Sequence, residues 1–225
     1  MSHIPIDDPF LLLLVSGPTA PKESLADKLL ASFVSSNFHD RAQKYIPAKS
    51  IRSLITQEEV EEELKKIEND RTIAPGVLQT YDHAFRRSLA MWTSTRAQKI
   101  FAICVTLEFN PAHLIYIMDR FRTSAFDDES LPLEDACSVA DPRIFVEGIW
   151  SKAKLDLLDE KQWCYLAPIF TPLRYKYDLW QNCIFPFTKD SSGPKVGAFG
   201  SVCMVTIHPD HQEHENMKNV RSHLA

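Results

Sequence analysis

The sequence predicts a mainly α-helical fold with a short C-terminal β-hairpin. Apolar residues recur at three- and four-residue spacing through much of residues 56–121, which is the period of a helix with one buried face. Only 6 of the 225 residues are glycine, and four of these lie from Gly148 to Gly200, close to a strand-like stretch near the C-terminal end. These two observations predict helices first and strands last.

Composition and charge limit the classes of function. The chain has 44% apolar and 24% charged residues, which is typical of a globular domain, and its formal net charge is -5. This charge, without any basic run, argues against binding to nucleic acid and against a basic membrane-binding face. The apolar run Phe10–Val15 is too short to span a bilayer.

The cysteines indicate the compartment. They are spread singly with no C-x-x-C pair, which predicts reduced thiols in an intracellular protein, either cytoplasmic or nuclear, rather than a disulfide framework or a zinc site. The five positions are Cys104, Cys137, Cys164, Cys183 and Cys203.

The sequence divides into three predicted parts. Residues 1–50 are expected to form a partly irregular arm, because prolines interrupt two apolar stretches, residues 10–15 and 25–33. Residues 51–170 are expected to form a helical module, and residues 171–225 a separate β-containing part.

The clearest local signal lies in residues 56–71. Thr56 and Glu59 match a capping box, in which each side chain bonds the backbone amide of the other residue. The apolar residues that follow share one helical face: Val60, Leu64 and Ile67. The pattern predicts a helix that begins at residue 57.

Three further helices are predicted before residue 125. One covers residues 81–89, and the next takes Ser94 or Thr95 as its N-cap and includes Ile100–Val105, which is apolar on all sides and therefore predicted at the centre of the core. The third begins with Asn110 as N-cap. Its buried face is expected to comprise Leu114, Ile117, Met118 and Phe121.

The second half of the chain is less regular. Residues 122–142 are acidic and polar, which predicts a loop that crosses the surface. Residues 151–158 are predicted to be helical, and the aromatic segment 163–170 to pack in the core and end in an extended piece. The periodicity changes at Ile184, and Val202–Ile207 is predicted to be a β-strand.

One segment suggests a chemical role. It reads Gly197-Ala198-Phe199-Gly200-Ser201-Val202 and precedes the predicted strand. Its glycines allow the backbone amides of a turn to approach phosphates closely, and the valine could cover a purine ring. An ordinary glycine-containing hairpin has the same spacing, so both interpretations stay open.

This segment resembles the nucleotide loop that opens a protein kinase, G-x-G-x-F-G-x-V, and the chain from Phe187 onward resembles the first strand of that fold. Three more segments, in this order, resemble filamentous-fungal serine/threonine protein kinase-like proteins: residues 96–103, residues 160–168 and residues 207–211. The resemblance spans roughly residues 50–211. It implies a helical region ahead of a kinase small lobe, of which residues 171–225 would form an incomplete part.

The same resemblance implies weak binding of ATP with Mg. The positions that match the loop are Gly197, Ala198, Phe199, Gly200 and Val202, with the glycines in a backbone cradle and the valine against adenine. Lys195 stands where the first glycine of the loop is expected. The chain contains no H-R-D and no D-F-G, so no catalytic residue is assigned, and phosphoryl transfer by this chain alone is not expected.

Two functions therefore stay open. The first is a truncated kinase-like protein with a degenerate ATP loop, and the second is a non-catalytic helical module that binds a protein partner or regulates a kinase. A third pattern, His208, His211 and His214, could bind a metal from one helical face, but Pro209 favours a polar turn there, and no metal site is predicted.

Overall fold

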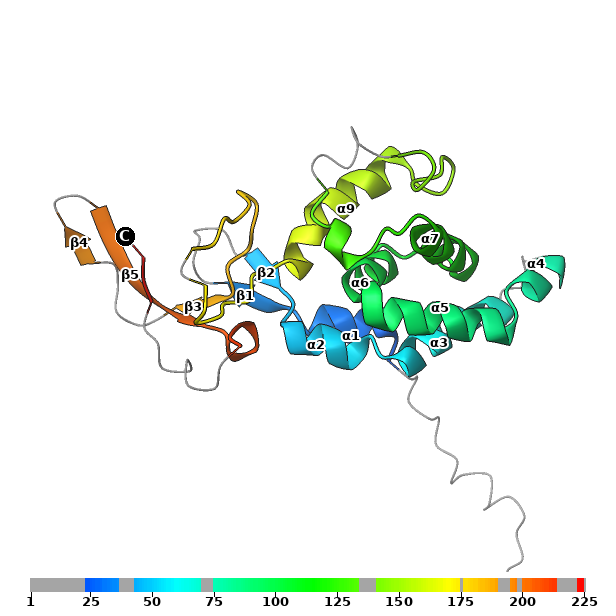
Figure 1. Ribbon diagram of the computed structural model, residues 1–225, viewed down its shortest axis with the longest axis horizontal. Coiled ribbons are helices and arrows are strands. Elements are labelled where there is room, and N and C mark those ends of the chain that lie inside the picture. The colour runs from blue at the N-terminus through cyan, green and yellow to red at the C-terminus, as the bar shows by residue number, and fades with distance from the viewer. Residues whose placement is uncertain are drawn as a thin grey trace, which may run out of the picture.

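Short helices make up most of the described structure, and the strands of the C-terminal segment extend from one end of it (Figure 1). The computed structural model describes residues 23–36, 43–69, 75–133, 141–174, 176–189, 195–197, 200–213 and 222–224. The prediction of a mainly helical fold that ends in strands is confirmed for these residues.

The elements follow one another in a helix-rich order. The helices are α1 (Leu25–Ala31), α2 (Ala48–Leu54), α3 (Gln57–Lys65), α4 (Pro75–Thr80), α5 (His83–Arg96), α6 (Gln98–Thr106), α7 (Pro111–Thr123) and α9 (Lys152–Tyr165). Three 3-10 turns are η2 (Lys66–Asn69), η3 (Asp128–Ser130) and η4 (Pro209–His211). The strands are β1 (Val34–Ser36), β2 (Gln43–Tyr45), β3 (Phe187–Lys189), β4 (Lys195–Gly197), β5 (Gly200–Ile207) and β6 (Ser222–Leu224).

Helix α6 lies at the centre of the helical module. Every residue from Ile100 to Val105 is buried, as the all-round apolar run predicts. The helix packs against α1, α2, α5, α7 and α9. At about 25 cal/mol for each Å² of apolar surface, burial on all sides makes this helix a large apolar contribution to the stability of the core.

Two predicted helix starts are confirmed. Thr56 accepts a hydrogen bond from the backbone amide of Glu59 at 3.3 Å and begins α3. Asn110 accepts one from the amide of His113 at 2.8 Å and begins α7. The four residues predicted on the apolar face of α7 are all buried. Local capping signals of this kind therefore place helix starts correctly where the cap follows a loop.

The predicted N-cap at Ser94 or Thr95 is wrong. Helix α5 continues past both residues to Arg96, and the hydroxyls of Ser94 and Thr95 donate to the carbonyl of Met91 at 3.1 and 2.8 Å. Serine and threonine inside a helix can satisfy themselves in this way against the preceding turn. Helix α6 starts after Ala97, which provides no side-chain cap.

The predicted surface loop over residues 122–142 is also partly wrong, because α7 extends to Thr123 and two acidic residues that follow are structural. The Asp128 carboxylate accepts hydrogen bonds from the backbone amides of Lys99 and Ile100, each at 3.0 Å, and so caps α6. Asp127 is buried and accepts from the Arg96 guanidinium at 2.6 Å. Burial raises the pKa of Asp128 against the opposing effect of these amides.

The described part of the predicted N-terminal arm is not separate from the helical module. Leu25 and Leu29 of α1, together with Ile46, belong to the same buried core as α6. Strands β1 and β2 form an antiparallel pair that the sequence analysis did not predict, with Val34 opposite Tyr45. Residues 23–36 and 43–50 therefore pack as part of the helical module.

Helix α9 is longer than predicted. It begins after the N-cap Ser151, where the predicted helix begins, but it continues to Tyr165 and so includes part of the aromatic segment. Inside it the fully buried amide of Gln162 accepts from the backbone nitrogen of Leu133 at 2.7 Å and donates to its carbonyl at 3.0 Å. Beyond the helix, Phe170 forms a parallel bridge with Gln212, as an extended segment does.

The C-terminal strands form a small antiparallel sheet around β5. Strand β3 pairs with the second half of β5, placing Phe187 opposite Ile207, and β4 pairs with the first half. Strand β6 pairs with the middle of β5. A separate small apolar cluster stabilises this sheet: Phe187, Val205 and Ile207, with Phe170 and Phe185 packed against them.

Candidate functional site

The predicted nucleotide loop lies at the turn between β4 and β5. Gly197 pairs directly with Gly200, so the two glycines close an antiparallel hairpin. Ala198 and Phe199, which join them, lie outside the described residues. A two-residue connection between paired strands is common to the kinase loop and to an ordinary hairpin.

The strands around this turn locate the other positions named from the sequence. Lys195, which stands at the first glycine position of the kinase pattern, pairs with Val202. The strand that pairs next with β5 is β6, whose residues are serine, histidine and leucine. In a kinase the third strand carries a lysine that holds the α- and β-phosphates. No residue of β6 can take that role.

A second group of polar side chains joins the C-terminal sheet to the helical module. His211 of η4 is buried, and its Nδ1 donates to the carbonyl of Pro168 at 3.0 Å. The ring of Tyr45, at the end of β2, meets the His211 ring edge-on at 5.3 Å and the His208 ring at 6.0 Å. We call the side chains of Tyr45, His208 and His211, together with the backbone carbonyl of Pro168, the histidine junction.

The electrostatics of the histidine junction indicate a structural role. Burial lowers the pKa of His211 from its ordinary value, so the ring is neutral at neutral pH. Burial, together with Asp210, raises the pKa of Tyr45 to about 12. Asp210 in turn forms an ion pair with Lys49 of the helical module at 3.1 Å.

The structure describes two of the three histidines in the H-x-x-H-x-x-H pattern, His208 and His211. The Nδ1 atom of His208 accepts a hydrogen bond from the backbone amide of Asp210 at 3.2 Å. His214 lies outside the described residues. Pro209 occupies the first position of the 3-10 turn η4, where a proline is tolerated. Within the described ranges, no three or more His, Cys, Asp or Glu side chains are grouped so that they could hold a metal.

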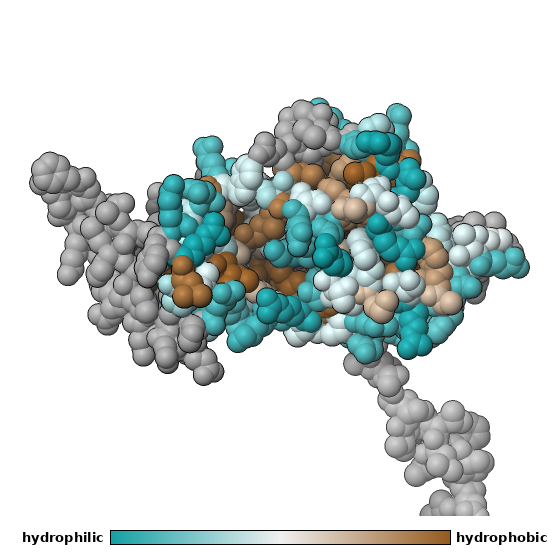
Figure 2. All heavy atoms as spheres, viewed as in Figure 1, coloured by the Kyte–Doolittle hydropathy of each residue, from teal (hydrophilic) through white to brown (hydrophobic). Residues whose placement is uncertain are grey.

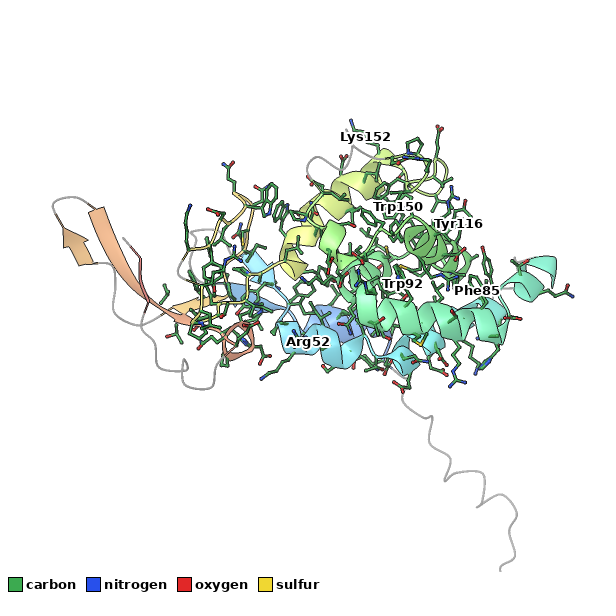
Figure 3. All side chains as sticks on the ribbon, in the orientation of Figure 1. Arg52, Phe85, Trp92, Tyr116, Trp150 and Lys152 are labelled. Carbon is green, nitrogen blue, oxygen red and sulfur yellow. The ribbon has the colours of Figure 1, made fainter. Side chains whose placement is uncertain are left out.

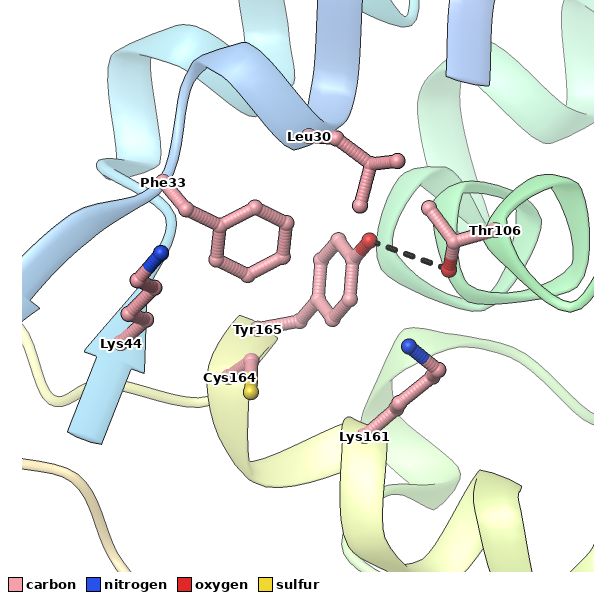
Figure 4. A pocket seen from close by; sticks show the side chains of 7 residues that line it. All are labelled: Leu30, Phe33, Lys44, Thr106, Lys161, Cys164 and Tyr165. Carbon is pink, nitrogen blue, oxygen red and sulfur yellow. Dashed lines mark hydrogen bonds between the residues drawn. The ribbon is translucent and has the colours of Figure 1, made fainter. Parts of the chain in front are cut away.

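A cleft that the sequence analysis did not predict lies between α1, β2, α6 and α9 (Figure 4). Its volume is about 320 Å³. Seven residues line it: Leu30, Phe33, Lys44, Thr106, Lys161, Cys164 and Tyr165. The Phe33 and Tyr165 rings meet edge-on with centroids 5.7 Å apart. Apolar atoms bordered by polar side chains are visible in the hollow beside β2 and α9 in Figure 2.

The polar groups of this cleft are basic or neutral. Lys44 and Lys161 line it from β2 and α9, and no carboxylate is among its described lining residues. The hydroxyls of Thr106 and Tyr165 share a hydrogen bond of 3.3 Å, drawn as a dashed line in Figure 4. Burial raises the pKa of the Cys164 thiol, so this cysteine is a poor nucleophile at neutral pH.

The sequence carried no signal for this cleft. Six of its seven residues come from α1, β2, α6 and α9, and Phe33 lies between α1 and β1, so the lining combines residues 30–44 with residues 106 and 161–165. Tyr165 was predicted to lie in the core, and it does, but its hydroxyl end reaches the cleft wall. Only the tertiary fold brings the two lysines to one opening.

No protein-family model matches the sequence, and no curated protein or solved structure matches it either. Among the helices that the structure describes, none has the length and apolarity needed to cross a bilayer.

Proposed function

We propose that this chain is a kinase-like protein with a degenerate nucleotide loop and without phosphotransferase activity of its own. The observation that carries the proposal is the pairing of Gly197 with Gly200 at the turn of the β4–β5 hairpin. This is the position at which the kinase loop presents its backbone amides to phosphates. The resemblance of the flanking segments to fungal kinase-like proteins supports the same assignment.

The loop is degenerate for two reasons. Lys195 replaces a glycine, and glycine is the residue that allows the closest approach of a backbone to phosphate. The neighbouring strand β6 also lacks the lysine that would hold the phosphates. ATP with Mg would therefore contact one wall of a pocket, and its binding would be weak.

A second candidate function is a non-catalytic helical module that binds a partner molecule. It is favoured by the helical core, which includes buried residues from α1 through α9, and by the cleft between these helices. The two candidates differ in whether a nucleotide stabilises the protein.

Thermal unfolding with and without Mg-ATP tests the proposal. At an ATP concentration equal to the dissociation constant, binding adds RT ln 2, about 0.4 kcal/mol, and raises Tm by about 1 °C. We expect a gain no larger than this in the wild type and none in Gly200→Val. A γ-phosphate transfer assay on a generic protein substrate should give no product.

The matched control is Gly76→Val. A Cβ added at Gly76 in α4 meets no atom within 4 Å, so this variant should respond to ATP as the wild type does. A gain of several degrees that Gly200→Val abolishes would show a working nucleotide site and contradict the degenerate loop. A gain that Gly200→Val retains would place ATP elsewhere, and no gain in any protein leaves the helical binding module as the function.

A further inference from the structure

We propose that the cleft between α1, β2, α6 and α9 binds a small organic carboxylate with an aromatic body. The proposal concerns a site apart from the β4–β5 hairpin and is independent of nucleotide binding. It rests on the shape of the cleft, on its charge and on its hydrogen-bonding groups.

The floor of the cleft suits a flat apolar group. Phe33 and Tyr165 present ring surface, and the Leu30 side chain stands beside them while remaining 54% exposed (Figure 4). An exposed leucine beside two aromatic rings is apolar surface that water must solvate. The volume of about 320 Å³ accommodates one aromatic ring with a short chain.

The charge of the cleft selects an anion. The Lys44 and Lys161 ammonium groups form no ion pair with any described residue, whereas Lys28, Lys49 and Lys66 each have a carboxylate partner. Two ammonium groups at one apolar opening, neither with a carboxylate partner among the described residues, favour a ligand that carries its negative charge at one end.

The hydroxyl pair provides a third point of recognition. Burial raises the pKa of Tyr165, so its phenol stays protonated at neutral pH and can donate a hydrogen bond. The Thr106 hydroxyl already donates to the carbonyl of Ile103 at 2.9 Å, so in the 3.3 Å bond between the two hydroxyls the phenol of Tyr165 is the donor and Thr106 the acceptor. A carboxylate beside Lys161 would take this phenol proton from Thr106, because a charge-assisted hydrogen bond to a carboxylate is stronger than a bond between two neutral hydroxyls.

A neighbouring cleft determines which side holds the negative end. Lys44 and Cys164 border both clefts, but the second one is also lined by Asp159 and Glu160. These carboxylates would repel an anion. The carboxylate of the ligand therefore lies towards Lys161 and Tyr165, and its apolar body lies against Leu30 and Phe33.

Calorimetric titration of the full chain with phenylbutanoate tests the proposal, with phenylbutanol as the uncharged ligand of nearly equal shape. We expect the carboxylate to bind about tenfold more tightly than the alcohol. Lys161→Met should weaken carboxylate binding by about fivefold and leave alcohol binding unchanged, because one partly exposed ion pair contributes a factor of this order. Lys44→Met should have a smaller effect in the same direction.

The control variant is Lys152→Met. Lys152 lies on the same helix, α9, at its exposed first turn and away from the cleft (Figure 3). The Lys152→Met variant loses one positive charge, as Lys161→Met and Lys44→Met do. A general effect of net charge on carboxylate binding would therefore appear equally in all three variants. Equal weakening in Lys152→Met and Lys161→Met would overturn the proposal.

A second measurement uses only the wild-type protein. Cys164 lines the cleft and is partly exposed, so slow alkylation with iodoacetamide, mapped by mass spectrometry, reports whether the cleft is occupied. Phenylbutanoate should slow the modification of Cys164 at least about threefold more than phenylbutanol does at the same concentration. Equal protection by both ligands, or protection by neither, would refute a carboxylate site at this cleft.

Discussion

Helix α6 and strand β5 are each the central element of their part of the molecule, but they are held in different ways. Helix α6 is buried on all sides by other helices, whereas β5 has Val205 and Ile207 buried and Thr206 exposed between them. The small sheet depends further on the histidine junction for its attachment to the helices. The comparison indicates a helical module stabilised by burial and a sheet stabilised by a few specific contacts.

The largest effect is expected at the centre of the helical module. Phe101→Ala removes a fully buried ring from α6 and leaves a cavity, which should lower the free energy of unfolding by about 3–5 kcal/mol. Urea denaturation followed by far-ultraviolet circular dichroism measures this change. The matched variant is Met91→Ala on α5, where the side chain is 55% exposed and the loss should stay below about 0.5 kcal/mol. Similar losses in both variants would contradict a core centred on α6.

A smaller and more local effect is expected in the sheet. Ile207→Ala removes a buried side chain from a cluster of only a few residues, so we expect a loss of about 2 kcal/mol. Hydrogen exchange should accelerate at the amides of β3 and β5, while those of α6 keep their protection. If α6 exchanged faster by the same factor, the sheet and the helical module would be one cooperative unit and the contrast between them would fail.

The smallest effect concerns pH and the histidine junction. The pKa of His211 is lowered by burial from its ordinary value of 6.5, so the folded protein binds this proton more weakly than the unfolded chain does. The stability that depends on the neutral ring is therefore present above pH 6.5 and is lost as the pH falls below it.

The variant His211→Phe keeps an aromatic ring beside Tyr45 but loses the hydrogen bond to Pro168, which should lower stability by about 1 kcal/mol at neutral pH. Its unfolding free energy should fall less than that of the wild type between neutral and mildly acidic pH. The matched variant is His208→Phe, which changes the other histidine ring that contacts Tyr45. An unchanged pH dependence in His211→Phe would remove His211 as the sensitive group.

The sequence predicted the parts of the fold that depend on neighbouring residues. The all-round apolar run Ile100–Val105 was correctly placed in the core, and the N-caps Thr56 and Asn110 were correctly identified. Strand β5 was also predicted, with its start two residues late. In each case the determining pattern lies within about one or two turns of chain, where periodicity and capping are readable.

The errors arose where distant residues meet. Ser94 and Thr95 were predicted to cap α6 because no pattern in the neighbouring residues indicates that the side chain of Asp128 bonds the first amides of this helix. Nor did any local signal show that Tyr45 contacts His211, or that Lys44 and Lys161 line the same cleft. Of the predicted site, the hairpin and its paired glycines are present, whereas nucleotide binding there stays a prediction.

Helix α6 is closed at both ends by side chains that come later in the chain. Asp128 bonds the amides at its start, and the Lys154 ammonium donates to the carbonyl of Leu107 at its end while lying 4.2 Å from the centre of the Phe109 ring. During synthesis, this helix, buried on every side from Ile100 to Val105, therefore emerges from the ribosome before either of its closing residues. The part of its apolar surface that α9 covers stays a target for chaperones, or for premature association, until α9 has also emerged.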